Sequence, residues 1–142
     1  MLTWIEIDGA RLRLNVEAFR TLKAPRAALM VVVKANAYGH GIEAVAPIVA
    51  AQADWLGVNS VDEAIALARL GVRKPVAILG HTPLDRADDV VENGYRQALY
   101  REDVARALSA SAARLKTTAK VHLKIETGTN RQGIALADLL SY

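Results

Sequence analysis

The chain of 142 residues contains no cysteine, which excludes a disulfide framework, a thiolate nucleophile and any metal site built on cysteine. Aromatic residues make up only 5% of the sequence, so no stacking platform for nucleic acid accompanies the basic residues. The longest apolar run, AALMVVV, is far shorter than the roughly 18 residues that a membrane span needs. Acidic residues in MLTWIEIDG stand where a signal peptide would be apolar. We therefore expect a soluble, cytoplasmic protein with no membrane partner.

The composition is that of a globular protein, with 52% hydrophobic residues and a formal net charge of +3. Basic residues gather in the first 26 positions, which raises the question of nucleic-acid binding. They are Arg11, Arg13, Arg20, Lys23 and Arg26. Because acidic residues are interspersed along the chain, this pattern is more typical of a solvated helix face. We expect no nucleic-acid partner.

Short apolar strands alternate with amphipathic helical patterns along the chain. The predicted strands are Ala28–Val33, Trp55–Val58, Val76–Leu79, Gln97–Tyr100 and Val121–Ile125. This alternation predicts an α/β fold with a parallel sheet and right-handed crossovers, as an open doubly wound sheet or a barrel. A complete eight-stranded barrel typically needs about 250 residues, so five strand–helix units could form only part of one.

Capping signals mark two of the intervening helices. Ser60 and Glu63 have the spacing of a capping box, and Gly71 is expected to end the helix that they begin. In TPLDRADDVVENG, Thr82 is the predicted cap, the following proline takes the first helical position, and Gly94 ends the helix.

Three further segments have recognisable patterns. TWIEID alternates like a strand, and Asp8 then caps a helix that extends to about Leu22. IEAVAPIVAA is helical in pattern, but Pro47 predicts that this helix starts late or bends. REDVARALSASAARL supplies another helix.

The stretch VVVKANAYGHG, residues 31–41, places Lys34 at the carboxyl end of the first predicted strand of a βα unit, where parallel folds bind ligands. Apolar surroundings would lower the pKa of Lys34 and make its amine a nucleophile for carbonyls, including the aldehyde of pyridoxal phosphate. The alternative is a strand-end lysine that extends into water. Gly39 and Gly41 precede a helix start, which attracts phosphate, and the Tyr38 hydroxyl can donate a hydrogen bond to an anion.

These residues resemble a known family. VVKANAYGHG resembles the pyridoxal-phosphate signature of bacterial alanine racemases. HLKIETGTNRQG, residues 122–133, resembles that family's motif near the end of the fifth barrel strand, and WIEIDGARLRLNVEAFR resembles its N-terminus. The resemblance implies an incomplete TIM-type (β/α)8 barrel of about five strand–helix units. It also implies a pyridoxal 5′-phosphate enzyme of fold type III that interconverts L- and D-alanine.

The resemblance assigns roles to four residues. Lys34 matches the lysine that binds the cofactor and then acts as one of two bases, and Tyr38 matches a tyrosine that contacts the cofactor phosphate. Arg131 matches an arginine near the substrate carboxylate, and Lys124 matches a lysine that many members carbamylate. Two neighbouring cations would repel, so we expect carbamylation of Lys124 or its pairing with Glu126. No metal is implied.

Two departures from the family's pattern limit this interpretation. The family commonly has DTGMGRLG where this chain has ETGTNRQG, and Thr129 and Asn130 would alter the wall beside the substrate, which leaves strict alanine specificity open. The family's C-terminal β domain and second-base tyrosine, contributed by the partner subunit, match nothing in these residues. We therefore expect a fragment without turnover of its own that forms a homo-oligomer or joins a complementing piece. The alternatives are a non-catalytic pyridoxal-phosphate-binding barrel module and a structural or assembly fragment.

Overall fold

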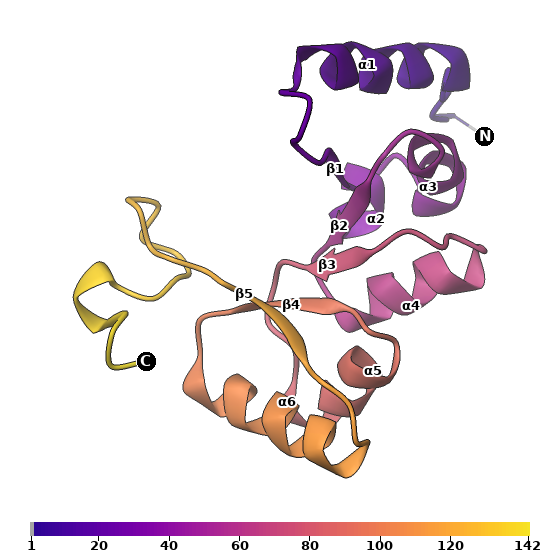
Figure 1. Cartoon of the computed structure of the whole chain (residues 1–142). Coiled ribbons are helices and arrows are strands. Elements are labelled where there is room, and N and C mark those ends of the chain that lie inside the picture. The colour runs from indigo at the N-terminus through magenta and orange to yellow at the C-terminus, as the bar shows by residue number, and fades with distance from the viewer. Residues whose placement is uncertain (1) are drawn as a thin grey trace. The chain divides into compact units, whose positions relative to one another are not determined.

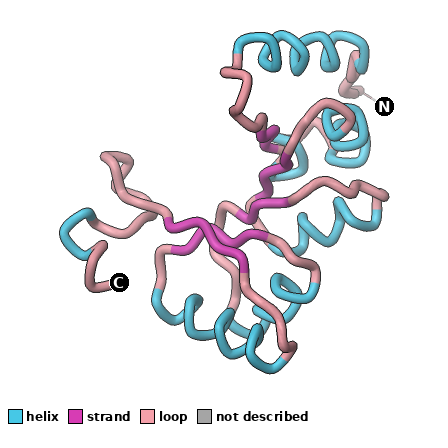
Figure 2. Tube along the Cα trace, in the orientation of Figure 1, coloured by secondary structure: helices cyan, strands magenta, loops and turns pink. Residues whose placement is uncertain are grey.

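The computed structural model describes residues 2–142, which form two compact units that divide between Val76 and Ala77. In each unit, short strands alternate with helices along the chain (Figure 1). Every strand pairing within a unit is parallel, which confirms the predicted α/β class. Loops connect each strand to the helix that follows it (Figure 2). None of the helices in residues 2–142 has the length and apolar character to cross a membrane.

The first unit holds two paired strands and four helices. They are α1 (Gly9–Leu22), β1 (Met30–Val32), α2 (Lys34–Tyr38), α3 (Ile42–Ala50), β2 (Trp55–Val58) and α4 (Val61–Arg69). Met30 lies opposite Trp55 in the ladder of β1 and β2. Leu56 of β2 and Leu67 of α4 are fully buried, and α3 contacts both α1 and α4. This apolar core supports the strands from which the candidate site extends.

The beginning of the chain confirms one prediction and corrects another. Asp8 caps α1 by accepting hydrogen bonds from the backbone N–H groups of Ala10 and Arg11, each at 3.0 Å, and α1 ends at Leu22 as expected. The strand predicted for TWIEID is wrong, because residues 3–8 have no regular secondary structure. Alternation alone does not make a strand, since the ladder needs a partner, and no described strand pairs with this segment.

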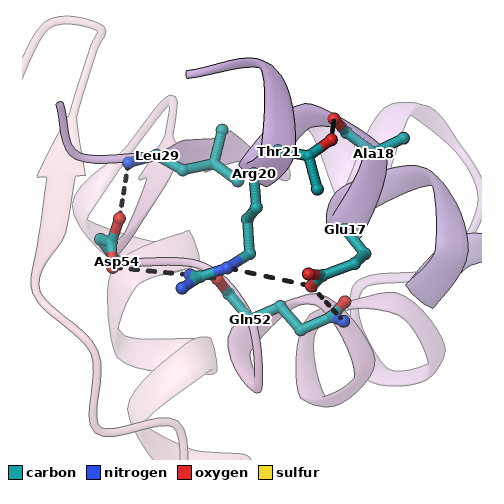
Figure 3. Close-up of polar contacts among 7 residues, drawn as sticks. All are labelled: Glu17, Ala18, Arg20, Thr21, Leu29, Gln52 and Asp54. Atoms are coloured by element: carbon teal, nitrogen blue, oxygen red, sulfur yellow. Dashed lines mark hydrogen bonds and ion pairs between the residues drawn. The ribbon is translucent and has the colours of Figure 1, made fainter. Parts of the chain in front are cut away.

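A polar network ties α1 to the loop before β2 (Figure 3). Arg20 donates to the carbonyl oxygen of Gln52 and lies 3.7 Å from the Asp54 carboxylate. Asp54 also accepts a hydrogen bond of 2.7 Å from the Leu29 N–H. That hydrogen bond, helped by the positive charge of Arg20, lowers the pKa of Asp54. The network lies at the amino ends of β1 and β2 and so leaves their carboxyl ends to the candidate site.

The helices after β1 and β2 test two further predictions. α3 includes Pro47 in its interior, so the late start considered for this helix is wrong. Ser60 caps α4 through a 3.3 Å hydrogen bond from the Glu63 N–H to its hydroxyl, as the capping box predicts. α4 stops just before Gly71, which has a positive φ of 77°. The glycine is therefore the expected end signal.

The second unit holds three parallel strands in chain order. Its elements, with β3 beginning at the unit boundary, are β3 (Val76–Ile78), η1 (Leu84–Arg86), α5 (Ala87–Glu92), β4 (Arg96–Leu99), α6 (Glu102–Arg114), β5 (Lys120–Leu123) and η2 (Leu136–Asp138). Leu99 lies opposite Leu123 in the ladder of β4 and β5. Val90 of α5 and Leu108 of α6 are buried, and these two helices pack together. The strand bounds differ from those predicted by at most two residues.

Thr82 does not cap a helix, which corrects its predicted role. Its hydroxyl is buried and donates a 2.6 Å hydrogen bond to the side-chain oxygen of Gln97, whose amide nitrogen donates to the carbonyl of Gly80 at 2.7 Å. The helical segment begins instead with the 3₁₀ turn η1, which has Pro83 at its N-cap. A buried amide must find partners, and that requirement outweighs the capping preference of the threonine. Gly94, at φ 65°, ends the segment as predicted.

Candidate functional site

Lys34 follows directly on the carboxyl end of β1. The N–H of Val33 donates to the carbonyl of Gly57 at 2.8 Å, so the backbone pairing with β2 continues to the residue before the lysine. The Val33 side chain is buried and Lys34 is half-buried. In the described part of the chain, no carboxylate lies within ion-pair distance of the Lys34 amine. The strand therefore presents an amine without a counter-ion at the end where parallel sheets bind ligands.

A left-handed helical turn follows Lys34. Ala35, Asn36, Ala37 and Tyr38 have φ values of 51°, 54°, 54° and 56°. Side chains of L-residues crowd the backbone in this region, at a cost of roughly 1–2 kcal/mol for each residue. Local hydrogen bonds from the Ala37 N–H to Val33 and from the Gly39 N–H to Ala35, at 2.9 and 3.0 Å, close the turn. A backbone of this kind persists only where its surroundings hold it.

Side chains reinforce the turn from within and from α4. The Asn36 side-chain oxygen accepts a 2.8 Å hydrogen bond from the N–H of Ile42, the first residue of α3. The Glu63 carboxylate accepts 2.7 Å hydrogen bonds from the N–H groups of Ala35 and Asn59. Sequence reasoning saw Glu63 only as part of a capping box and missed this contact. Asn36 carried a usable signal for the turn, because asparagine tolerates left-handed backbone.

Tyr38 ends the left-handed turn with 60% of its surface exposed. It lines a cavity of about 350 Å³, together with residues of α1, β1 and α3. Val33 contributes to the apolar floor of the cavity, while Asn15 and His40 add polar groups. Lys34 is not among the lining residues. The Tyr38 side chain is therefore accessible, but Lys34 does not line the cavity beside it.

Lys124 lies just beyond β5 in the second unit. Its backbone N–H donates to the carbonyl of Leu99 at 2.9 Å, which continues the pairing of β5 with β4. Its amine donates a 3.0 Å hydrogen bond to the side-chain oxygen of Gln132 and lies 5.8 Å from the centroid of the Tyr100 ring. The expected pairing of Lys124 with Glu126 is not observed. Gln132 takes the place of the carboxylate, and no pattern in the sequence indicated this partner.

Glu126 is instead hydrogen-bonded to the backbone of its own loop. Its carboxylate accepts hydrogen bonds from the N–H groups of Gly128 at 2.5 Å and of Arg131 at 3.3 Å. Backbone N–H groups, those of Asn130 and Gly128 foremost, lower the pKa of Glu126. A parallel bridge between Ile125 and Ile134 closes the loop. The carboxylate thus organises the segment that carries the candidate substrate arginine.

Arg131 and Lys124 line the same small cavity of about 120 Å³. Glu126 and Gln132 also contribute to its polar lining, and Arg131 itself is exposed. The structure therefore brings two of the predicted site residues together in the second unit, and it places Lys34 and Tyr38 on one turn of the first. In residues 2–142, no cluster of three or more histidine, aspartate or glutamate residues could hold a metal ion.

Comparisons with known proteins connect these residues to a family. The family model described as alanine racemase, N-terminal domain, matches residues 7–142. The alanine racemase of Symbiobacterium thermophilum is 43% identical over 139 residues, an alignment that covers 96% of this chain and 36% of that protein. The chain thus spans about a third of the length of the curated relatives that it matches.

Solved structures agree with this match. The alanine racemase from a D-cycloserine-producing Streptomyces lavendulae has a TM-score of 0.88 and 34% identity, over 95% of this chain and 35% of that one. A histidine racemase from Leuconostoc mesenteroides has a TM-score of 0.82 and 29% identity, over 94% of this chain and 36% of that one. The similarity confirms the predicted fold class, an incomplete parallel (β/α) barrel of the TIM type.

Proposed function

Since the chain belongs to the alanine racemase family, we propose that it forms the lysine-bearing part of a pyridoxal-phosphate-dependent amino-acid racemase. The observation that carries the proposal is the position of Lys34. The carboxyl end of β1 presents the amine of a half-buried lysine without a carboxylate partner, followed by an accessible tyrosine. An unpaired amine of this kind suits covalent binding of an aldehyde and proton transfer better than a structural ion pair does.

The residues present fit the proposed cofactor. The Lys34 amine would bind its aldehyde, and the Tyr38 hydroxyl, on a side chain that is 60% exposed, would donate a hydrogen bond to its phosphate. When bound, pyridoxal phosphate withdraws electrons from the substrate α-carbon and so makes the α-hydrogen acidic. A modest base on this chain is then sufficient to move that proton.

Each candidate residue has a part in the proposed reaction. The Lys34 amine removes or returns the α-proton on one face of the amino acid. Arg131, exposed at the rim of its loop, binds the substrate carboxylate through its planar guanidinium. Lys124 supports the position of Arg131 in the shared cavity, either as the amine that Gln132 now binds or as a carbamate. Racemisation also needs a base on the opposite face, which the resemblance assigns to a tyrosine outside residues 1–142.

We propose alanine as the substrate, which is a more specific claim than an amino-acid racemase. The matched relatives are named alanine racemases, while one similar structure is named a histidine racemase. Thr129 in this chain lines the cavity that holds Arg131, where the ETGTNRQG stretch departs from the family's common residues. A screen of alanine and larger amino acids as substrates, with a full-length protein that contains residues 1–142, would establish the preference.

The proposed partner is a second copy of the protein or a complementing segment of it. β5 is exposed along its whole length in the second unit, with Leu123 at 53% exposure. A strand that pairs along one edge only, as β5 does with β4 in residues 2–142, favours association along its other edge. Sedimentation of residues 1–142 should therefore show self-association, and a monomer at high concentration would contradict this part of the proposal.

The proposed function is tested first by cofactor loading. Pyridoxal phosphate added to the protein should produce a visible absorbance band that borohydride fixes on a single lysine. Lys34→Ala should abolish the band, whereas Lys120→Ala, which removes an exposed lysine of β5, should retain it. A band that survives loss of Lys34 would contradict the proposal.

Turnover then separates the proposal from its alternative. The full-length protein should racemise alanine, and Lys34→Ala should lower kcat by about 10³-fold or more. Residues 1–142 alone should bind cofactor without turnover, and racemisation by them would show that the second base lies within this chain. Loading without turnover in the full-length protein would favour the non-catalytic module.

A further inference from the structure

The left-handed turn after Lys34 receives one hydrogen bond from a side chain of another element. Within the described residues, the bonds that close the turn otherwise join residues 33–42 to one another. The exception is the 2.7 Å bond from the Ala35 N–H to Glu63, which lies 28 residues further along the chain on α4. Ala35 is the residue next to the candidate base, so this contact acts directly on the backbone that carries the lysine.

The second oxygen of Glu63 binds the equivalent place on the neighbouring strand. It accepts a 2.7 Å hydrogen bond from the N–H of Asn59, the residue that follows β2. One carboxylate thus bridges the chain just beyond the carboxyl ends of β1 and β2. Both bonds run from a neutral N–H to a charged oxygen, which makes them stronger than ordinary amide bonds.

α4 holds this carboxylate in place independently of the turn. Ser60 caps the helix by accepting a hydrogen bond from the Glu63 N–H, and the flanking side chains of Ala64 and Leu67 are fully buried. In a reciprocal capping box the glutamate side chain would bind the N–H of Ser60. Here it reaches Asn59 and Ala35 instead. The departure frees Glu63 to act on the lysine-bearing segment.

We propose that Glu63 is a positioning residue for Lys34. By holding the N–H of Ala35, its carboxylate keeps the turn left-handed and sets the direction in which the lysine side chain leaves β1. The inference rests on the proposed function of Lys34 as base and cofactor lysine. Proton transfer depends steeply on such placement, and a displacement of about 1 Å can reduce a rate by about 100-fold.

The key variant is Glu63→Gln, which keeps the size of the side chain. A carboxamide has only one oxygen, so its NH2 group would face one of the two N–H donors and a hydrogen bond would be lost. Glu63→Asp keeps the charge but is shorter by one methylene, and it should restore part of the loss. One control separates positioning from general damage. Glu43→Gln makes the same change on an exposed residue of α3.

Kinetics and absorbance of the cofactor-loaded full-length protein are the first readout. Glu63→Gln should lower kcat by about 10- to 100-fold with KM within about threefold, and it should shift the Lys34-dependent absorbance band. Glu43→Gln should stay within about threefold of the unsubstituted protein and keep the band unchanged. Equal losses in Glu63→Gln and Glu43→Gln, or no loss in Glu63→Gln, would overturn the proposal.

Amide exchange in the cofactor-free protein is the second readout and does not require turnover. At least one of the Ala35 and Asn59 amides should exchange about tenfold faster in Glu63→Gln than in Glu43→Gln. Unchanged exchange of both amides would overturn the proposal whatever the kinetics. If the unsubstituted protein shows no Lys34-dependent band, the proposed function fails, and the exchange data alone then decide whether Glu63 holds the turn.

Discussion

The Lys34 turn of the first unit and the loop of residues 126–133 in the second resemble each other in how they are held. Each follows a parallel strand, and in each a glutamate carboxylate accepts backbone N–H groups of the segment. The first segment contributes one such group and the second contributes two. The glutamates differ in origin, because Glu63 comes from a helix 28 residues away and Glu126 belongs to the loop itself. The first segment therefore depends on the fold around it, whereas the second can organise locally.

The lysines of the two segments also differ. Lys34 has no carboxylate partner among the described residues, whereas Lys124 is bonded to Gln132 and lies over the Tyr100 ring. A free amine suits covalent chemistry, and a bonded one suits support of a neighbouring group. In this chain the left-handed turn beside Lys34 receives a side-chain contact from another element, whereas the loop beside Lys124 is held by its own residues.

The largest expected effect on the free energy of unfolding comes from replacing a glycine of each segment with alanine. A Cβ on Gly133 would lie 2.5 Å from the Glu126 nitrogen and 2.8 Å from the Ile125 carbonyl carbon, whereas one on Gly39 would meet nothing within 4 Å. Both residues have positive φ. Gly133→Ala should therefore lower the free energy of unfolding by about 3 kcal/mol, and Gly39→Ala by about 1 kcal/mol. Urea denaturation measures both, and equal losses would contradict the close packing of the second loop.

A smaller effect is expected from the partner of Lys124. Gln132→Leu removes the oxygen that accepts the hydrogen bond from the lysine amine. A double-mutant cycle with Lys124→Met should give a coupling free energy of about 1 kcal/mol for this half-buried pair. A coupling energy near zero would show that Gln132 does not hold the lysine, and the contrast with Lys34 would then disappear.

The smallest expected effect is the pH dependence of the second loop. Because the pKa of Glu126 is lowered in the folded protein, its contribution to stability is complete above the ordinary glutamate pKa of about 4.3. The contribution is lost as the pH falls through the lowered pKa. The N–H resonance of Gly128 should therefore titrate below the pH range of an ordinary glutamate, and Glu126→Gln should abolish the titration. A titration that persists in Glu126→Gln would assign it to another group.

Much of the fold could be predicted from local patterns. β2 occupies the predicted residues, and the signals at Asp8, Ser60 and Gly94 mark helix boundaries where they were expected. These signals succeed because capping and chain reversal depend on residues a few positions apart. The TWIEID segment and Thr82 were wrongly predicted because their outcome depends on partners far along the chain.

The residues of the candidate site remain a prediction from the motifs, and their contacts could not be predicted. The motifs indicated Lys34, Tyr38, Lys124 and Arg131, and the structure places each beyond the carboxyl end of a strand. Two contacts were not predicted. Glu63 accepts a hydrogen bond from Ala35, and Lys124 binds Gln132 rather than Glu126. A capping-box glutamate and a loop glutamine have several available donors, and sequence spacing does not rank them.

The sequence by itself determined the parallel α/β alternation, the amine at the end of β1 and the family, because hydrophobic period and short motifs are properties of neighbouring residues. The tertiary structure alone decided which carboxylate holds which backbone, and it made four left-handed residues acceptable after Lys34. Strained backbone of this kind persists only where its surroundings hold it, and the geometry of the fold determines which distant element comes close enough to contribute.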